Sequence, residues 1–176
     1  MSIFAASLML SGTAIAKGNP MVGGAAMYPT KTIVENAVNS KDHTTLVAAV
    51  KAAGLVDTLN SPGPFTVFAP TNAAFAKLPA GTVDTLLKPE SKAMLTSVLT
   101  YHVVPGRISA ADIAANAKAH KGMATYTTVQ GEKLMFTKAG MGWKITDSKG
   151  HSGKITIANV DQSNGVIHVI DTVMMP

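Results

Sequence analysis

The feature that most constrains the fold is an apolar run near the end of the chain, Gly165 to Asp171 (GVIHVID). The run encloses a single histidine and shows no alternation between apolar and polar residues, which predicts a strand that is buried on both faces. Asn164 and Gly165 favour the positive φ angles of a two-residue hairpin turn. We therefore expect the preceding segment, Lys154 to Val160, to pair antiparallel with this strand.

The first half of the sequence has mainly helical periodicity. Apolar stripes predict helices over Thr32 to Val38, from about His43 to Ala53, and through Met94, Leu95, Val98 and Leu99. Asp42 is the expected N-cap of the second helix, and Gly54 its end. Further helical segments are expected at Leu55 to Leu59, Ala73 to Leu78 and from Thr82, and Ser109-x-x-Asp112 has the layout of a capping box.

Strands are expected from Phe65 onward and dominate the end of the sequence. The first expected strand, Phe65 to Ala69, ends at Pro70, and Thr71 or Asn72 caps the helix that follows. Another strand is expected at Tyr101 to Val104. From Ala124 the period changes to two, which predicts strands at Ala124 to Val129, Glu132 to Thr137, Trp143 to Asp147, Lys154 to Val160 and Val166 to Val173. Helices first and strands last indicate an α+β or β-sandwich domain with the helices packed on one side.

Length and composition indicate one folded domain. The chain has 176 residues, of which 47% are hydrophobic and 14% charged, enough for one core and too few residues for two ordinary domains. Cysteine is absent, which excludes disulfides, thiolate metal sites and a cysteine nucleophile.

The N-terminus resembles an export signal. Residues 1–16 carry no charge, run apolar from Ile3 to Leu10 and end in Ala14-Ile15-Ala16, which predicts a signal peptide cleaved after Ala16 and a secreted or periplasmic protein. The positively charged start of such signals is missing, so a flexible apolar tail is the alternative. The run is too short to span a bilayer, so no membrane insertion is expected. Residues 17–28 are predicted to be a linker, and 29–176 the folded domain.

The basic charge does not indicate nucleic acid as a partner. The net charge is +5, but the chain has only one arginine and no nucleic-acid-binding motif accompanies the lysines. Seven lysines lie between Lys118 and Lys154, against Glu132 and Asp147. This excess predicts attraction of an anionic glycan, with Lys133, Lys138, Lys144 and Lys149 as the expected contacts. The alternative is that these lysines only keep strand faces soluble.

The histidines do not predict a metal site. None forms an HxH, HxxxH or HExxH motif, and His43, His120 and His151 lie in separate polar segments that are expected to be exposed. His102 and His168 lie in apolar segments, where a neutral ring needs hydrogen-bond partners. We expect the partner of His102 to lie in the turn formed by residues 70–72.

No catalytic or cofactor-binding signature is present. The sequence lacks GxSxG, SxxK, phosphate-binding glycine loops and an obvious pair of carboxylates. A triad of Ser109, His102 and Asp112 can be drawn, but its neighbours predict the start of a helix instead. We therefore expect neither catalytic residues nor a cofactor.

Three segments together resemble one known family. Phe65 to Pro79 (FTVFAPTNAAFAKLP), Tyr101 to Gly106 (YHVVPG) and the final NGVIHVIDTVMMP are similar, in this order, to the signature segments of the fasciclin-like (FAS1) domain. The resemblance covers about Tyr28 to Pro176 and implies a β-sandwich or wedge with N-terminal helices packed on one side. The structural or adhesion motif that it implies comprises Thr71, Asn72, Tyr101, His102, Asn164, Gly165 and His168.

The resemblance implies adhesion rather than catalysis. The partner would be a cell-surface or matrix protein or an anionic glycan. Family members that recognise integrins use an Asp-Ile pair that aligns here with Asn159-Val160, so the acid is lost, although Asp161 lies beside it. Some family members carry carotenoids, so the alternative function is an apolar carrier of carotenoid- or lipid-like molecules, for which the ten methionines are suited. A hydrolase is the weakest alternative.

Overall fold

The computed structural model of the protein describes residues 19–176. The predicted signal peptide at 1–16 therefore lies outside the described residues. Within residues 19–176, no helix combines the length and the apolar character needed to cross a bilayer.

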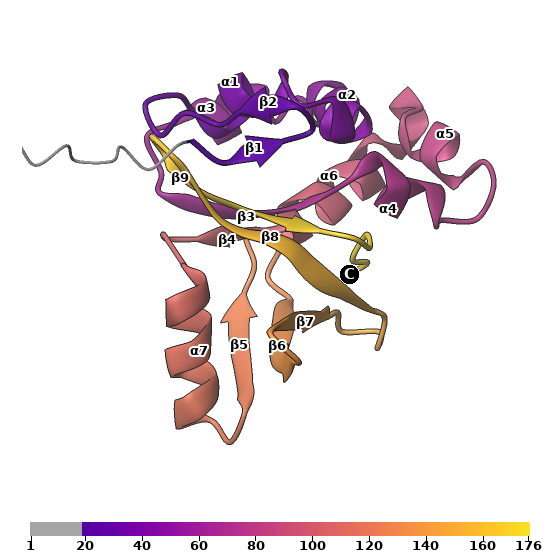
Figure 1. The fold of residues 1–176 in the computed structure, drawn as a ribbon. Helices are drawn as coiled ribbons and strands as arrows, with labels where there is room; N and C mark the ends of the chain where they lie inside the picture. Colours follow the sequence, from indigo (N-terminus) through magenta and orange to yellow (C-terminus); the bar gives the residue numbers. More distant parts are fainter. Residues whose placement is uncertain (1–18) are drawn as a thin grey trace, which may run out of the picture.

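One seven-stranded sheet forms the centre of the molecule (Figure 1). Its strands lie in the order β4-β3-β9-β8-β7-β6-β5. Only β3 and β9 are parallel neighbours; the other pairs are antiparallel. The strands are β3 (Phe65–Pro70), β4 (Val103–Pro105), β5 (Met123–Thr127), β6 (Lys133–Ala139), β7 (Gly142–Thr146), β8 (Ser152–Gln162) and β9 (Gly165–Ile170).

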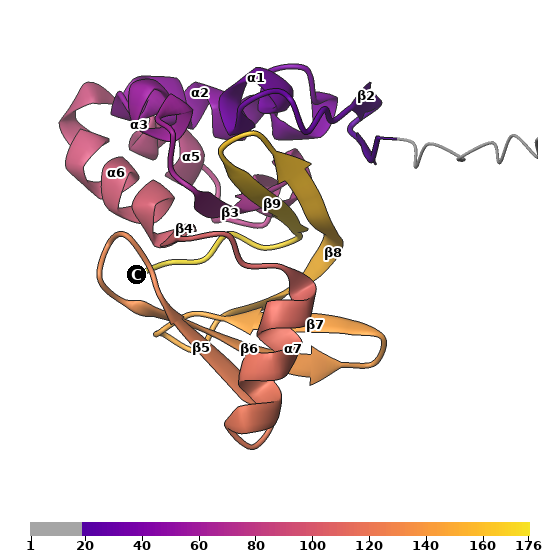
Figure 2. The same cartoon turned by 90° about the vertical axis from the view of Figure 1, so that its left-hand side faces the viewer.

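The long strand β8 bends this sheet into a wedge. Its register with β9 shifts between Ile155 and Ile157 and again between Ile157 and Val160, and such bulges bend a strand. One end of β8 pairs with β7 and the other lies along β9, so the halves β4-β3-β9 and β7-β6-β5 splay apart (Figures 1 and 2). This α+β wedge with helices to one side confirms the predicted fold class.

The helices divide between the two halves of the wedge. Figures 1 and 2 together show α1 to α6 gathered over the half that holds β3 and β9, whereas α7 packs along β5. The helices are α1 (Ile33–Ala37), α2 (Thr44–Ala53), α3 (Val56–Asn60), α4 (Asn72–Ala76), α5 (Thr82–Leu86), α6 (Lys92–Tyr101) and α7 (Ala110–Ala119), with 3-10 turns η1 (Lys41–His43) and η2 (Pro89–Ser91).

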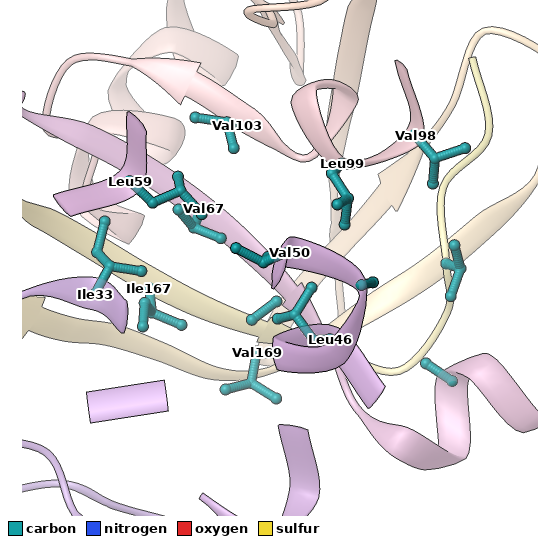
Figure 3. Close-up of a cluster of buried hydrophobic side chains, with 14 of the residues drawn as sticks. Ile33, Leu46, Val50, Leu59, Val67, Val98, Leu99, Val103, Ile167 and Val169 are labelled. Atoms are coloured by element: carbon teal, nitrogen blue, oxygen red, sulfur yellow. The ribbon is translucent and has the colours of Figure 1, made fainter. Parts of the chain in front are cut away.

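Two hydrophobic cores meet at β9. The first lies between the helices and the sheet and includes Leu46, Val50, Val67 and Ile167, whose side chains point toward one another in Figure 3. The second lies inside the wedge and includes Phe68, Tyr101, Phe136, Ile145 and Met174. All six residues of β9 are buried, as predicted from its unbroken apolar run.

Several predicted helix boundaries are confirmed. The Thr71 side chain accepts a hydrogen bond from Ala74 N and caps α4, Gly54 ends α2 in the left-handed conformation, and Ser109 and Asp112 form a capping box at the start of α7.

Three helix predictions are wrong. Asp42 does not cap α2, because it lies within η1, which precedes that helix. The N-terminus of α2 has no side-chain cap. Met94 is 59% exposed, since the buried stripe of α6 runs through Leu95, Val98 and Leu99. Tyr101 and His102 are not in a strand: α6 ends at Tyr101, His102 is its C-cap, and β4 starts only at Val103.

The hairpin between β8 and β9 also differs from the prediction. The register pairs Gln162 with Gly165, so the two turn residues are Ser163 and Asn164, and Gly165 belongs to the strand. Glycine is required at this position for a different reason. A Cβ atom on Gly165 would lie 1.9 Å from the backbone oxygen of Phe65.

Part of the expected linker is ordered against the domain. Strands β1 (Met21–Val22) and β2 (Ala25–Ala26) form a hairpin, and Val22 and the adjacent Met27 are buried in the first core. Gly23 in this hairpin packs closely against Ser40. A Cβ atom at this position would lie 2.4 Å from the Ser40 hydroxyl, so the approach leaves no room for a side chain. His43 is only 3% exposed, which corrects its predicted exposure. It lines a small cavity together with Val22 and Met27, and its polar sequence neighbours gave no sign of this burial.

Candidate functional site

Asn164 holds several elements together at the turn between β8 and β9. Its side-chain oxygen accepts a hydrogen bond from Ile33 N (3.0 Å) at the start of α1. Its amide nitrogen donates to the backbone oxygens of Leu59 and Ser61 at the end of α3, and its backbone oxygen accepts from Phe65 N. A buried side chain with this many partners acts as a structural connector.

Thr71 and Asn72 have a similar role at the other end of β3. Thr71 caps α4. The Asn72 side chain accepts from Thr45 N (3.0 Å) and donates to the Lys41 oxygen (2.8 Å). It therefore fixes α4 against η1 and α2.

Tyr101 and His102 are both buried, at 0% and 2% exposure. The Tyr101 hydroxyl donates to the Lys133 oxygen (2.8 Å) and accepts from Ser148 N (2.9 Å), and burial raises its pKa. His102 Nδ1 donates to the Val98 oxygen (2.7 Å), and Nε2 accepts from Met174 N (3.0 Å). The predicted partner in the turn of residues 70–72 is therefore wrong. Burial lowers the His102 pKa to about 4, so the ring is neutral at physiological pH.

His168 is also fully buried. Its Nε2 donates to the Ile108 oxygen (2.7 Å), and its Nδ1 accepts from Asn159 N (3.2 Å). Burial lowers its pKa. Asn159 has a positive φ of 58°, and its side-chain oxygen accepts from Ala110 N at the start of α7 (2.8 Å).

The drawn hydrolase triad is not assembled, because His102 does not join Ser109 and Asp112. Ser109 Oγ bonds to Asp112 (2.9 Å) within the capping box, while both ring nitrogens of His102 are bound to the backbone. Asp161, the acid beside the aligned Asn159-Val160 pair, is exposed and forms an ion pair with Arg107 at 3.4 Å.

The other histidines do not cluster either. His120 and His151 are exposed, as predicted. Among residues 19–176, no group of three or more His, Cys, Asp or Glu residues is arranged to hold a metal ion.

The outer face of β5 to β8 brings lysines together. The register places Met123, Thr137, Lys144 and Lys154 in one cross-strand row, and Thr125, Met135, Thr146 and Ser152 in the next. Lys133 follows, opposite Thr127. These residues share a face because cross-strand partners and alternate residues point to the same side. We call them the lysine face; it contains lysines, hydroxyls and two methionines, and no acid.

Lys144 and Lys154 are the most informative pair on the lysine face. Both are exposed and directly opposite one another, where side chains lie about 5 Å apart at Cβ and like charges are destabilising. Two ammonium groups therefore face solvent side by side at this point of the sheet.

The four lysines predicted as contacts are not all on this face. Lys133 and Lys144 are there, but Lys138 lies over the Trp143 ring, 5.2 Å from its centroid, and Lys149 is in the β7–β8 turn. Lys154 was not among the four, and only the register between β7 and β8 shows that it lies opposite Lys144.

The apolar cavity expected of a carrier is small. It lies among α1, α2, α3 and the sheet, is lined by residues such as Val34, Val47 and Val56, and has a volume of about 40 Å³. Pockets that hold larger ligands have volumes of about 300–1,000 Å³. In this conformation the cavity does not accommodate a carotenoid.

A known fold matches this architecture. The structure of a FAS1 domain pair from the insect cell adhesion molecule Fasciclin I superposes on 83% of this chain and 51% of that chain, with a TM-score of 0.73 and 18% sequence identity. The class defined by the fold is therefore the FAS1-type wedge.

Sequence comparison identifies the family. The model of the Fasciclin domain matches residues 41–176. The chain belongs to the fasciclin-domain family.

Its relatives include bacterial proteins. Protein sll1483 of Synechocystis sp. is 51% identical over 158 residues, 89% of this chain and 79% of its own length. The immunogenic protein MPB70 of Mycobacterium bovis is 41% identical over 80% of this chain, and the cell surface glycolipoprotein MPB83 of the same species is 38% identical over 90%. The chain spans 66% of the length of each mycobacterial protein.

Proposed function

We propose that this protein is a non-enzymatic adhesion module that acts outside the cytoplasm and binds an anionic glycan of a cell surface or matrix through the lysine face. The observation that carries the proposal is the cross-strand pair of Lys144 and Lys154 on a face without an acid. The occurrence of a cell surface glycolipoprotein and a cell adhesion molecule among similar proteins supports the location and the type of function.

The chemistry of the lysine face suits a sulfated or uronic-acid polymer. Ammonium groups attract the anionic groups, and the hydroxyls of Thr137, Thr146 and Ser152 offer hydrogen bonds to sugar oxygens. An exposed sheet surface without a deep pocket also fits an extended chain better than a compact ligand. Steering by exposed charges is screened over about 8 Å at physiological ionic strength, so the binding should depend strongly on salt.

The experiment measures retention on immobilised heparin and alginate, as model polyanions, across a salt gradient. The double substitution Lys144→Gln with Lys154→Gln should elute at clearly lower salt than the wild type. The matched control is Lys51→Gln with Lys88→Gln, which makes the same change in net charge on the exposed helical side. If both doubles shift equally, only net charge matters and the proposed face is wrong.

A further inference from the structure

A second cleft, beside the C-terminal segment, has the features of a small-ligand site. It lies between α4 with its following loop, the β7–β8 turn and the C-terminal segment, and its volume is about 210 Å³. In Figure 1 the yellow C-terminal segment ends between α4 and that turn. The cleft is lined by the polar residues Lys77, His151 and Thr172 and by apolar residues that include Leu78, Val173 and Met175.

His151 is held in the cleft by a buried carboxylate. Asp147 has no exposed surface, and its Oδ2 accepts from His151 Nδ1 at 3.0 Å. The carboxylate also accepts from the backbone nitrogens of Lys149, His151 and Met175, at 2.8–3.1 Å. A carboxylate with four donors fixes the orientation of the ring, and with Nδ1 engaged, Nε2 is the nitrogen that a ligand can reach.

Lys77 supplies a cation on the opposite wall. Its ammonium donates to the backbone oxygen of Asp171 at 2.7 Å. Because an ammonium has three N–H donors, this bond positions the group and leaves two donors for a ligand. No acidic side chain lines the cleft. The Asp147 charge behind it is engaged by its four donors.

We propose that this cleft binds a small carboxylate that carries a short apolar substituent. Lys77 and the imidazolium form of His151, in which Nδ1 donates to Asp147 and Nε2 donates to the ligand, hold the carboxylate, and the apolar lining contacts the substituent. The volume, below that of pockets for drug-sized ligands, limits the ligand to a short-chain acid or to the end of a peptide. The proposal does not depend on glycan binding at the lysine face.

The test is a titration followed by protein NMR, with butyrate, its uncharged analogue butyramide, and an N-acetylated Ala-Ala dipeptide as the free acid and as the amide. Saturable shifts at residues 77–78, 151 and 172–175 with either acid, and at least fivefold weaker binding of the matching amide, support the proposal. The acid that binds more tightly identifies the source of the carboxylate. Equal binding of acids and amides, or no saturable shift, would overturn it.

Two variants locate the binding groups. Lys77→Gln and His151→Gln should each weaken binding of the preferred acid by at least fivefold, whereas Lys88→Gln, an exposed lysine outside the cleft, should leave it unchanged. The thermal midpoint of each variant shows whether the fold is intact. If both folded cleft variants bind like the wild type, the assignment is wrong.

Discussion

At the scale of single residues, the family signature proves to be mainly structural. Asn164, Gly165, His102 and His168 are buried and connect elements that are distant in the sequence. Tyr101 lies inside the second core, so its side chain cannot contact a partner in this conformation. Recognition is therefore expected at exposed residues outside the signature.

Gly165 offers the sharpest steric test. In Gly165→Ala the new Cβ would clash with the Phe65 oxygen, and because this contact is with backbone in a central parallel pair, the strands must move. We expect a loss of about 3 kcal/mol or more in the free energy of unfolding, measured by urea denaturation. Gly142→Ala is the control, since its Cβ would meet nothing closer than 3.9 Å; similar losses in both variants would contradict this account.

His102 predicts how stability depends on pH. Its pKa is about 4 in the folded protein and near 6.5 when unfolded, so between these values the unfolded state binds the proton more readily. The free energy of unfolding is therefore highest, as far as His102 is concerned, above pH 6.5. It falls by about 3 kcal/mol in all as the pH drops toward 4. Burial also lowers the pKa values of His43 and His168, so these two residues further decrease the free energy of unfolding when the pH falls.

The measurement is urea unfolding of the wild type and of His102→Gln at pH 7 and pH 4.5. The variant should be less stable at pH 7, because it disturbs the bonds to Val98 and Met174, but should lose less stability on acidification. His120→Gln, at an exposed position, should keep the wild-type dependence. The same loss in wild type and His102→Gln would mean that His102 does not titrate as described.

At the scale of secondary-structure elements, most local signals in the sequence were reliable, apart from the Asp42 cap and the Asn164-Gly165 turn, whereas long-range contacts were not predicted. The cap at Thr71, the capping box at Ser109 and the apolar run of β9 depend on neighbouring residues and were predicted correctly. The burial of His43 depends on a hairpin some twenty residues earlier. The pairing of Lys144 with Lys154 depends on strand register, which a lysine count does not contain. Tyr101 and His102 were misassigned because the helix passes into the strand without a breaking residue.

The lysine pair predicts a trade-off between stability and binding within the sheet. Lys154→Glu would place opposite charges across β7 and β8, so we expect the free energy of unfolding to rise by about 0.2–1 kcal/mol at low salt. The same change should abolish retention on polyanions. Lys133→Glu is the control for stability, because Lys133 faces Thr127 rather than a lysine on β5. A variant that is no more stable than the control would show that Lys144 and Lys154 do not repel each other.

At the scale of the whole molecule, the wedge separates a structural part from an exposed one. The helices and β3 and β9 bury the first core, and β5 to β8 present one face to the second core and the lysine face to solvent. The sequence predicted the fold class, since the order of helical and strand periodicity is a local property summed over the chain. It did not predict the bend in β8 or the cleft beside the C-terminal segment, which arise only when distant elements meet.

Glycan binding at the lysine face is tested most directly by a lysine-acylation footprint of the protein with and without a sulfated oligosaccharide, followed by mass spectrometry. If the lysine face binds the glycan, Lys144 and Lys154 are protected most strongly and Lys133 less, while Lys51 and Lys88 on the helical side react as before. Uniform protection of all lysines, or protection confined to the helical side, would contradict it.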